Sequence, residues 1–183
     1  MKSLILKYKS VLKFILTFLL VYGVLTFAYK LYLDYSDGSD YYPDFFTNQV
    51  AKQSDALVLA FGYDSQILKH PDEPSMKVII NGKYVARIIE GCNSISVIIL
   101  FVSFIIAFAG KFTSTFLYVL TGSILLYIVN VLRVAILSVG IYRYPWRTEE
   151  MHGVVFPLVI YGMVFLLWMF WVNRFSSLSR IDG

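Results

Sequence analysis

The sequence contains few of the residues on which most metal-binding and cofactor-binding sites depend. It has one cysteine and two histidines among 183 residues. A single cysteine excludes an internal disulfide, and one cysteine with two histidines gives none of the ligand spacings that metal sites use. No glycine-rich phosphate-binding loop is present. We therefore predict a protein with no metal ion and no cofactor.

Charged residues are also scarce, and their scarcity indicates a membrane protein. They make up 15% of this chain, against roughly a quarter of a soluble domain. Uncharged runs of about eighteen or more residues predict membrane-spanning helices. Four such runs occur, at 14–33, 91–110, 112 to about 142, and 153–173. The predicted fold is an all-α integral membrane protein with about four transmembrane helices in a bundle.

Basic residues indicate the orientation of these spans, since cytoplasmic loops carry an excess of lysine and arginine. The chain starts with four lysines and no acid in residues 1–13, Lys111 lies between the second and third spans, and Arg174 and Arg180 follow the fourth. The segment 34–90 instead holds nine acids and five bases. We expect an N-terminus in the cytoplasm and the segment 34–90 outside the plasma membrane. The basic start is followed by no A-x-A-like cleavage site, so we predict an uncleaved anchor.

The net charge of +4 follows from this topology, and no basic patch of the kind that binds nucleic acid is evident. The predicted partner of the chain's surface is therefore a lipid bilayer, and no nucleic acid is expected. Trp168 and Trp171, near the end of the fourth span, are typical of an interfacial belt. Glycines in or beside the spans indicate close helix packing, and these are Gly110, Gly122, Gly140 and Gly162.

The chain divides into four regions on this basis. They are a basic tail with the first anchor at 1–33, an extracytoplasmic loop at 34–90, a core of three transmembrane helices at 91–175 and a cytoplasmic tail at 176–183. In the loop, two β-prone runs flank Asn81-Gly82, a pair that favours a tight hairpin turn. We predict a small β-hairpin near 77–88, and only short helices in the rest of the loop.

Three chemically capable side chains are expected at the outer ends of three different spans. The second and fourth spans enter from outside, which puts Cys92 and His152 at their outer ends. The third span enters from inside at Phe112, and Arg133 is 21 residues further on, about 31 Å along a helix. The hydrocarbon core is about 30 Å thick. We therefore predict that Cys92, Arg133 and His152 meet at one depth.

Each of these residues also has an ordinary structural interpretation. A cysteine beside an apolar helix is most often a small buried hydrophobe, and a histidine at a helix start is most often a cap or a surface residue. Arg133 would anchor the third span in the headgroups if that span ended near Leu132, but nine uncharged residues follow Arg133. Asn130 lies three residues earlier on the same helix face. A charge in an apolar run favours a functional site.

Together the three side chains predict thiol chemistry. A thiolate is the reactive form of cysteine, and a nearby imidazole or guanidinium favours it. Cys92 would be the nucleophile, and His152 would take and return protons near neutral pH. Arg133 would stabilise an oxyanion or hold a substrate carboxylate. Glu149 and Glu150 are candidates to orient His152, because they are close to it in sequence.

Three short blocks of sequence carry a family resemblance. The blocks "EGCNSISVIIL", "NVLRVAIL" and "HGVVFPLVIYGMVFL" resemble the signature blocks of the exosortase/archaeosortase family, in particular a compact bacterial branch of the Bacteroidetes type. The resemblance covers about residues 91–173. It implies a membrane cysteine enzyme with Cys92, Arg133 and His152 as catalytic residues, the arginine lying in an N-x-x-R block that starts at Asn130.

The resemblance also implies a function. Such enzymes recognise exported proteins through a C-terminal sorting signal, which consists of a short motif, a transmembrane helix and a basic tail. The expected activity is cleavage at the motif by a peptidase or transpeptidase whose active site is extracytoplasmic. Two features depart from the family pattern: Ser94 stands where glycine is frequent, and four spans are predicted where many relatives have about eight.

Two other functions stay open on the sequence. One is a non-catalytic membrane accessory protein of an export or assembly system, which would keep the helix bundle without the chemistry. The other is a lipid- or glycan-linked transferase that uses the same cysteine.

Overall fold

The computed structural model of the chain describes residues 8–36, 40–108 and 110–174, so the predicted tail at 176–183 and most of the basic start lie outside the described residues. Helices dominate the structure, as predicted. The elements in chain order are α2 (Lys9–Ser36), α3 (Phe45–Ala60), β1 (Ser65–Lys69), β2 (Met76–Ile80), β3 (Lys83–Ile88), η1 (Glu90–Cys92), α4 (Ile95–Ala107), α5 (Phe112–Arg143), η2 (Pro145–Arg147), α6 (Thr148–Glu150), η3 (Met151–Val155) and α7 (Phe156–Arg174).

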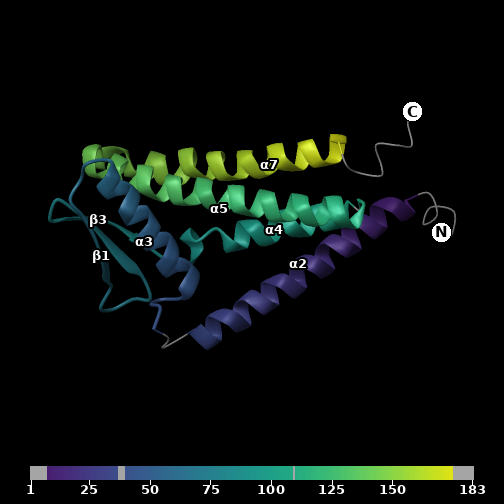
Figure 1. Cartoon of the computed structure of the whole chain (residues 1–183), viewed down its shortest axis with the longest axis horizontal. Helices are drawn as coiled ribbons and strands as arrows, with labels where there is room; N and C mark the ends of the chain where they lie inside the picture. Colours follow the sequence, from purple (N-terminus) through teal and green to yellow (C-terminus); the bar gives the residue numbers. More distant parts are fainter. Residues whose placement is uncertain (1–7, 37–39, 109, 175–183) are drawn as a thin grey trace.

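The molecule is elongated, with the sheet at one end of a helix bundle. Figure 1 shows α4, α5 and α7 side by side, with α2 crossing them obliquely and α3 lying against the sheet. The start of α2, the connection between α4 and α5 and the end of α7 lie at the end far from the sheet. We call the two ends the sheet end and the far end. The predicted loop segment and the predicted inner connections are thus at opposite ends of the bundle.

Three helical segments are long and apolar enough to cross a membrane among the described residues. They are Lys9–Ser36, Phe112–Arg143 and Pro145–Arg174. Each contains one of the predicted spans. The last segment runs continuously through η2, α6, η3 and α7, because the short elements after α5 lead directly into the long helix.

The predicted span at 91–110 is different, and it reduces the number of long spans from the predicted four to three. Its helix α4 covers 13 residues, or about 20 Å, which is less than the roughly 30 Å of a hydrocarbon core. The helix is short because the polar residues before Ile95 form the turn η1 and a left-handed residue, Ser94, with φ of 65°. The residues before α4 therefore form a polar turn at the sheet end.

The predicted hairpin is present and belongs to a larger sheet. β2 and β3 pair in antiparallel register, and Asn81 and Gly82 both have positive φ between them, 49° and 74°. Asparagine and glycine tolerate this conformation, as a two-residue turn requires. The strand β1 was not predicted, and it pairs with the other edge of β2 to give the order β1-β2-β3.

Helix α3 is longer than the short helices that we expected in the loop, at 16 residues. Its start is capped by Asp44, whose Oδ1 accepts a hydrogen bond from the backbone N–H of Thr47 at 3.0 Å. One face of α3 is buried against α5, where Ser54 Oγ donates to the backbone carbonyl of Val131 at 3.3 Å. Packing against α5, rather than local propensity, therefore accounts for its length.

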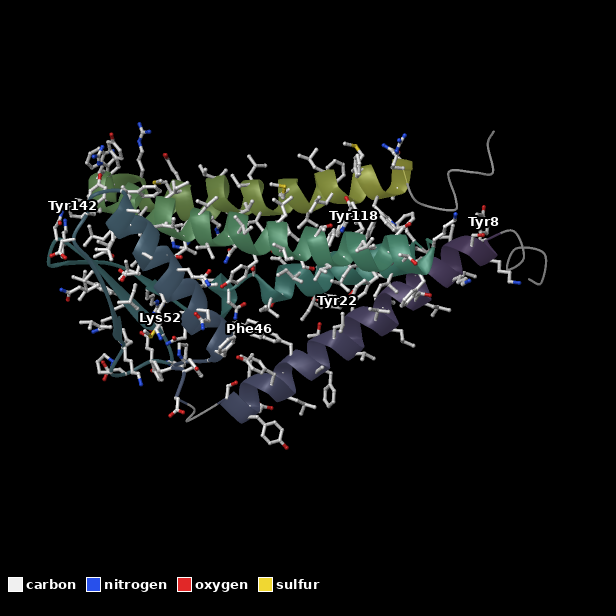
Figure 2. The ribbon with its side chains drawn as sticks, in the orientation of Figure 1. Tyr8, Tyr22, Phe46, Lys52, Tyr118 and Tyr142 are labelled. Carbon is white, nitrogen blue, oxygen red and sulfur yellow. The ribbon has the colours of Figure 1, made fainter. Side chains whose placement is uncertain are left out.

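The described residues form two larger apolar cores and a smaller cluster of Leu137 and Ile141 beside β3. One lies between the sheet, α3 and the sheet end of α5, and includes Val50, Ile80 and Ala135. The other lies between α4, α5 and α7 and includes Phe101 and Trp171. Tyr118 and Tyr142, labelled in Figure 2, lie towards opposite ends of α5. The bundle is thus held together by one core at each end.

Trp171 does not form the interfacial belt that we predicted, because it is fully buried in the second core. Gly110 is the residue that accommodates its ring, since a Cβ there would lie 2.8 Å from the ring atom Cζ2. Close packing is likewise confirmed at Gly122 and Gly140, whereas a Cβ on Gly162 would meet nothing within 4 Å.

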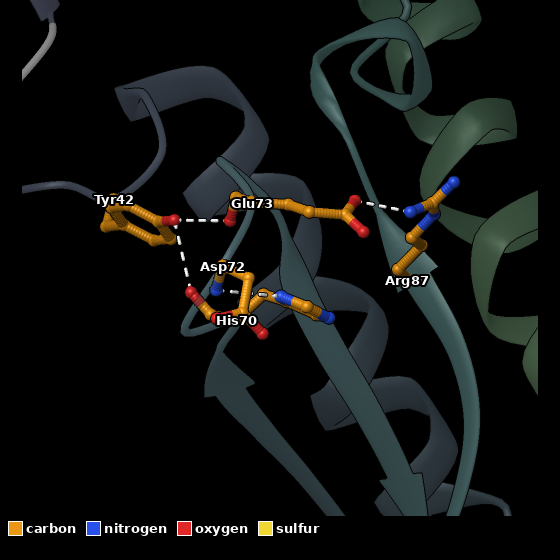
Figure 3. Close-up of polar contacts among 5 residues, drawn as sticks. All are labelled: Tyr42, His70, Asp72, Glu73 and Arg87. Carbon is orange, nitrogen blue, oxygen red and sulfur yellow. Dashed lines mark hydrogen bonds and ion pairs between the residues drawn. The ribbon is translucent and has the colours of Figure 1, made fainter.

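Polar contacts fix the connection between β1 and β2. Figure 3 shows Tyr42 donating to the backbone carbonyls of His70 and Glu73, and Arg87 of β3 paired with the carboxylate of Glu73. The ring Nδ1 of His70 accepts from the backbone N–H of Asp72 at 3.2 Å. His70 is therefore part of this connection.

Candidate active site

Cys92 lies in the short turn η1, which joins strand β3 to helix α4. The turn is closed by a hydrogen bond from the backbone N–H of Cys92 to the carbonyl of Ile89 at 2.9 Å. The cysteine is partly buried and packs against the core at the sheet end. The turn thus holds the thiol at the start of α4 without enclosing it completely.

Asn93, the next residue, anchors this turn to three helices. Its side chain is buried, and its Nδ2 donates to the Tyr29 hydroxyl at 2.8 Å and to Thr47 Oγ1 at 3.1 Å. Its Oδ1 accepts from the backbone N–H of Ile95 at 3.0 Å, which satisfies a free donor at the start of α4. Tyr29 belongs to α2 and Thr47 to α3. We did not predict this role for Asn93, although its position directly after the sole cysteine was a signal.

Ser94 completes the turn in a left-handed conformation, with φ of 65° and ψ of −1°. Its Oγ donates to the carbonyl of Asn93 at 2.6 Å. Left-handed backbone is costly for residues that carry a Cβ and is adopted readily by glycine. The conformation therefore gives a physical reason why glycine would also fit this position.

Asn130 connects the turn to helix α5. It is fully buried, and its Nδ2 donates to the backbone carbonyl of Cys92 at 2.7 Å. Its Oδ1 accepts from Nη1 of Arg133 at 3.1 Å, so the two residues lie on one helix face, as predicted. The side chain of Asn130 therefore bridges the cysteine backbone and the arginine.

His152 lies in η3, the π-helical segment that precedes α7. Such segments are rare and are frequent at functional sites. His152 and Cys92 both line one pocket of about 420 Å³ at the sheet end. Arg133 does not line this pocket, and it is linked to the turn of Cys92 through Asn130. The structure thus places Cys92 and His152 at one pocket and connects Asn130 and Arg133 to the backbone of Cys92.

The pocket has further lining residues that sequence reasoning missed. They come from β3, from the residues that follow it and from the segment after α5, and include Tyr84, Arg87, Ile89 and Thr148. No motif marked these residues, because they approach Cys92 only through the pairing of the sheet and its packing on α5.

Glu149 and Glu150 lie in α6, directly before η3, and both are exposed. In the part of the chain that the structure describes, no hydrogen bond or ion pair joins either carboxylate to His152. The predicted orienting role of Glu150 therefore has no contact to support it. No cluster of three or more histidine, cysteine, aspartate or glutamate side chains suited to a metal ion occurs within residues 8–36, 40–108 and 110–174.

The arrangement is suited to thiol chemistry at an accessible pocket. A half-buried thiol, an exposed imidazole and a guanidinium supply a nucleophile, a proton carrier and a permanent positive charge.

Comparison of the chain with protein-family models, with curated proteins and with solved structures finds no match.

Proposed function

We propose that this chain is a membrane-embedded cysteine peptidase or transpeptidase that cleaves exported proteins at a membrane surface. The observation that carries the proposal is that Cys92 and His152 line one pocket. The contact of Asn130 with the carbonyl of Cys92 and with Arg133 supports it further, because it ties the third candidate residue to the same turn.

The reaction would proceed by acyl transfer. The Cys92 thiolate attacks the carbonyl carbon of a peptide bond, and a C–S bond forms while the carbonyl oxygen takes up negative charge. Collapse of this intermediate breaks the C–N bond, and His152 donates a proton to the leaving amine. Water or an amine then attacks the thioester, gives up its proton to His152 and releases Cys92 as a thiolate.

Arg133 would act on the charge that develops in the intermediate. A guanidinium is charged at all relevant pH values and donates hydrogen bonds in a fixed plane. Its hydrogen bond to the buried Asn130 restrains the guanidinium before a substrate arrives. A positive group that is already oriented stabilises an oxyanion more than a mobile one does.

The proposed location of the enzyme is the plasma membrane, with the sheet end outside and the N-terminus in the cytoplasm. Three apolar helices of sufficient length support insertion in a bilayer. The excess of lysine and arginine at the far end supports this orientation, since Lys111 and Arg174 lie there.

The proposed substrate is an exported protein that carries a C-terminal motif, a transmembrane helix and a basic tail. This part of the proposal depends on the resemblance of the blocks around Cys92, Arg133 and His152 to the exosortase/archaeosortase family. A substrate anchored by a helix would present its cleavage motif at the membrane surface, at the depth that we propose for the pocket.

Cysteine labelling tests the proposal, because the chain has one thiol and any label reports on Cys92 alone. In intact cells, a membrane-impermeant maleimide is expected to label Cys92 from outside, and the rate should fall about tenfold or more in His152→Ala. The matched control is His70→Ala, since His70 is the other histidine and belongs to the β1–β2 connection. Equal rates in all three chains, or labelling from the cytoplasm only, would contradict the proposal.

The adduct on Cys92 separates the remaining functions. A peptidase should accumulate a thioester to a peptide when the acceptor is withheld, and Cys92→Ala should abolish cleavage of the substrate. A lipid or glycan on Cys92 would instead indicate a transferase. Full biological activity of Cys92→Ala would indicate a non-catalytic accessory protein.

A further inference from the structure

Strand β3 is an edge strand beside the candidate active site. The sheet order is β1-β2-β3, so β2 pairs with one side of β3, and no other strand pairs with it among the described residues. Successive residues of an antiparallel strand direct their backbone N–H and C=O groups to opposite edges. The second edge of β3 therefore carries hydrogen-bonding groups that β2 does not use.

The pocket that contains Cys92 and His152 runs along β3. Four successive residues of β3, Tyr84 to Arg87, line the pocket. A pocket lined by four successive residues of a strand follows that strand along its length rather than touching it at one point. The lining then continues through Ile89 to Cys92. Strand β3 and the thiol thus border the same space.

The edge is held in place by its packing and contains one irregularity. Val85 and Ala86 pack against Leu137 and Ile141 of α5. Opposite β2, Ala86 pairs with Val78 and Tyr84 pairs with Ile79, so Val85 is an extra residue that forms a bulge. Bulges bend a strand, increase its twist and are frequent beside active sites. A rigid edge would bind an extended segment without first having to become ordered.

We infer that the free edge of β3 binds an extended segment of the substrate polypeptide as a fourth strand and guides the peptide bond to be cleaved towards Cys92. This inference depends on the proposed function, because it concerns the polypeptide substrate of that reaction. Backbone hydrogen bonds to β3 would supply affinity for any sequence, and the pocket would select side chains at alternate positions. The segment from Tyr84 to Arg87 is about 10 Å long, enough to pair with three or four residues.

A polypeptide is favoured over an acyl chain of a lipid as the occupant. The edge offers backbone donors and acceptors, and an acyl chain can satisfy neither. The pocket also contains the polar side chains of Arg87, Thr148 and His152. The pocket extends from β3 to Cys92, the candidate nucleophile. A polypeptide that is to be cleaved must reach Cys92, whereas a second copy of this chain that only paired with β3 would have no need to.

The first test compares two electrophiles on the full chain in lipid nanodiscs. These are acetyl-alanine chloromethyl ketone and its longer analogue with four alanines. In both, the Cys92 sulfur displaces chloride, so a C–S bond forms and the C–Cl bond breaks. The longer probe should alkylate Cys92 about tenfold faster, since one or two additional net hydrogen bonds correspond to about a tenfold change. Rates with free cysteine in solution correct for intrinsic reactivity.

If the probe pairs with β3 as a strand, only every second backbone nitrogen of the probe should matter for the rate of alkylation. Methylation of one backbone nitrogen of the longer probe should remove the gain when that nitrogen faces β3, and leave it intact when the nitrogen faces away. Equal sensitivity at every nitrogen, or no gain with length, would overturn the inference. If Cys92 still reacted faster in the unmodified chain than in His152→Ala, the proposed function would stand while the strand inference failed.

A second test does not depend on the reactivity of Cys92. In a Cys92→Ser chain, p-benzoylphenylalanine replaces Tyr84 in β3 or, as the control, Gln66 in the outer strand β1. A biotinylated penta-alanine peptide should crosslink to the β3 position more than to the β1 position. Methylation of those alternate backbone nitrogens of the peptide that face β3 should abolish the difference. Equal crosslinking would overturn the inference, and so would crosslinking only between two copies of the chain.

Discussion

Asn130 donates a hydrogen bond to the backbone carbonyl of Cys92 at 2.7 Å, and the two residues are 38 positions apart in the chain. This hydrogen bond connects helix α5 to the turn η1, which contains Cys92. Because Asn130 also accepts a hydrogen bond from Arg133, one buried amide sets the position of the turn relative to the guanidinium. The geometry of the candidate site therefore depends on a residue that itself carries no reactive group.

Replacing Asn130 by alanine tests this dependence. Asn130→Ala leaves the carbonyl of Cys92 without this donor and removes the acceptor of Arg133 Nη1, which should cost about 2–3 kcal/mol. We expect a lower melting temperature in detergent and a changed alkylation rate of Cys92 by iodoacetamide. The matched control is Ser138→Ala, a buried polar residue of α5 that bonds only within its helix, to Val134. Equal alkylation rates in the two variants would contradict the role given to Asn130.

Ser94 provides a second test through its backbone conformation. With φ of 65°, the position should accept glycine without loss of stability, whereas the β-branched Ser94→Val should destabilise the protein by about 2 kcal/mol. Melting temperatures of the two variants measure the contrast. Ser96→Val, in the helical backbone of α4, is the control and should change the melting temperature much less. If glycine and valine at position 94 were equivalent, the left-handed turn would be wrong.

Tyr29 links helix α2 to the turn after Cys92. Tyr29→Phe removes the hydroxyl that accepts from Asn93 Nδ2 and should lower the free energy of unfolding by about 1 kcal/mol. The control is Tyr22→Phe, which changes an exposed tyrosine about two helical turns earlier in α2. Thermal unfolding of both variants in the same detergent measures the difference. No difference between them would argue against the contact of α2 with Asn93.

Gly122 tests the close packing of α4 on α5. A Cβ at this position would lie 2.4 Å from Cζ of Phe101, which is fully buried, so Gly122→Ala forces the ring or the helices to move. Overpacking of this kind costs about 1–3 kcal/mol. Gly162→Ala in α7 meets open space and should be neutral or slightly stabilising. Melting curves of the two variants should therefore move in different directions, and equal destabilisation would contradict the packing.

The sequence predicted those parts of the fold that depend on local composition. Long apolar runs predicted α2, α5 and α7, and Asn81-Gly82 predicted the hairpin of β2 and β3. The structure also places Cys92 and His152 at one pocket and links Arg133 to Cys92 through Asn130, whereas their common depth in a membrane stays a prediction. Their catalytic roles stay a prediction. The full extent of α3 and the strand β1 were not predicted, because contacts with distant segments determine both. The short α4 was not predicted either, and it follows from the turn formed by the residues directly before it.

The sequence by itself determined the apolar helices and the tight turn at Asn81-Gly82, since composition and spacing along one helix or strand are local properties. Only the tertiary structure decided that Asn93 joins three helices, that Asn130 holds the carbonyl of Cys92, and that β3 and His152 line one pocket. These relationships join residues far apart in the chain. They exist because burying the apolar faces of α3, α5 and the sheet in one core leaves each polar side chain only the partners that the packing brings near.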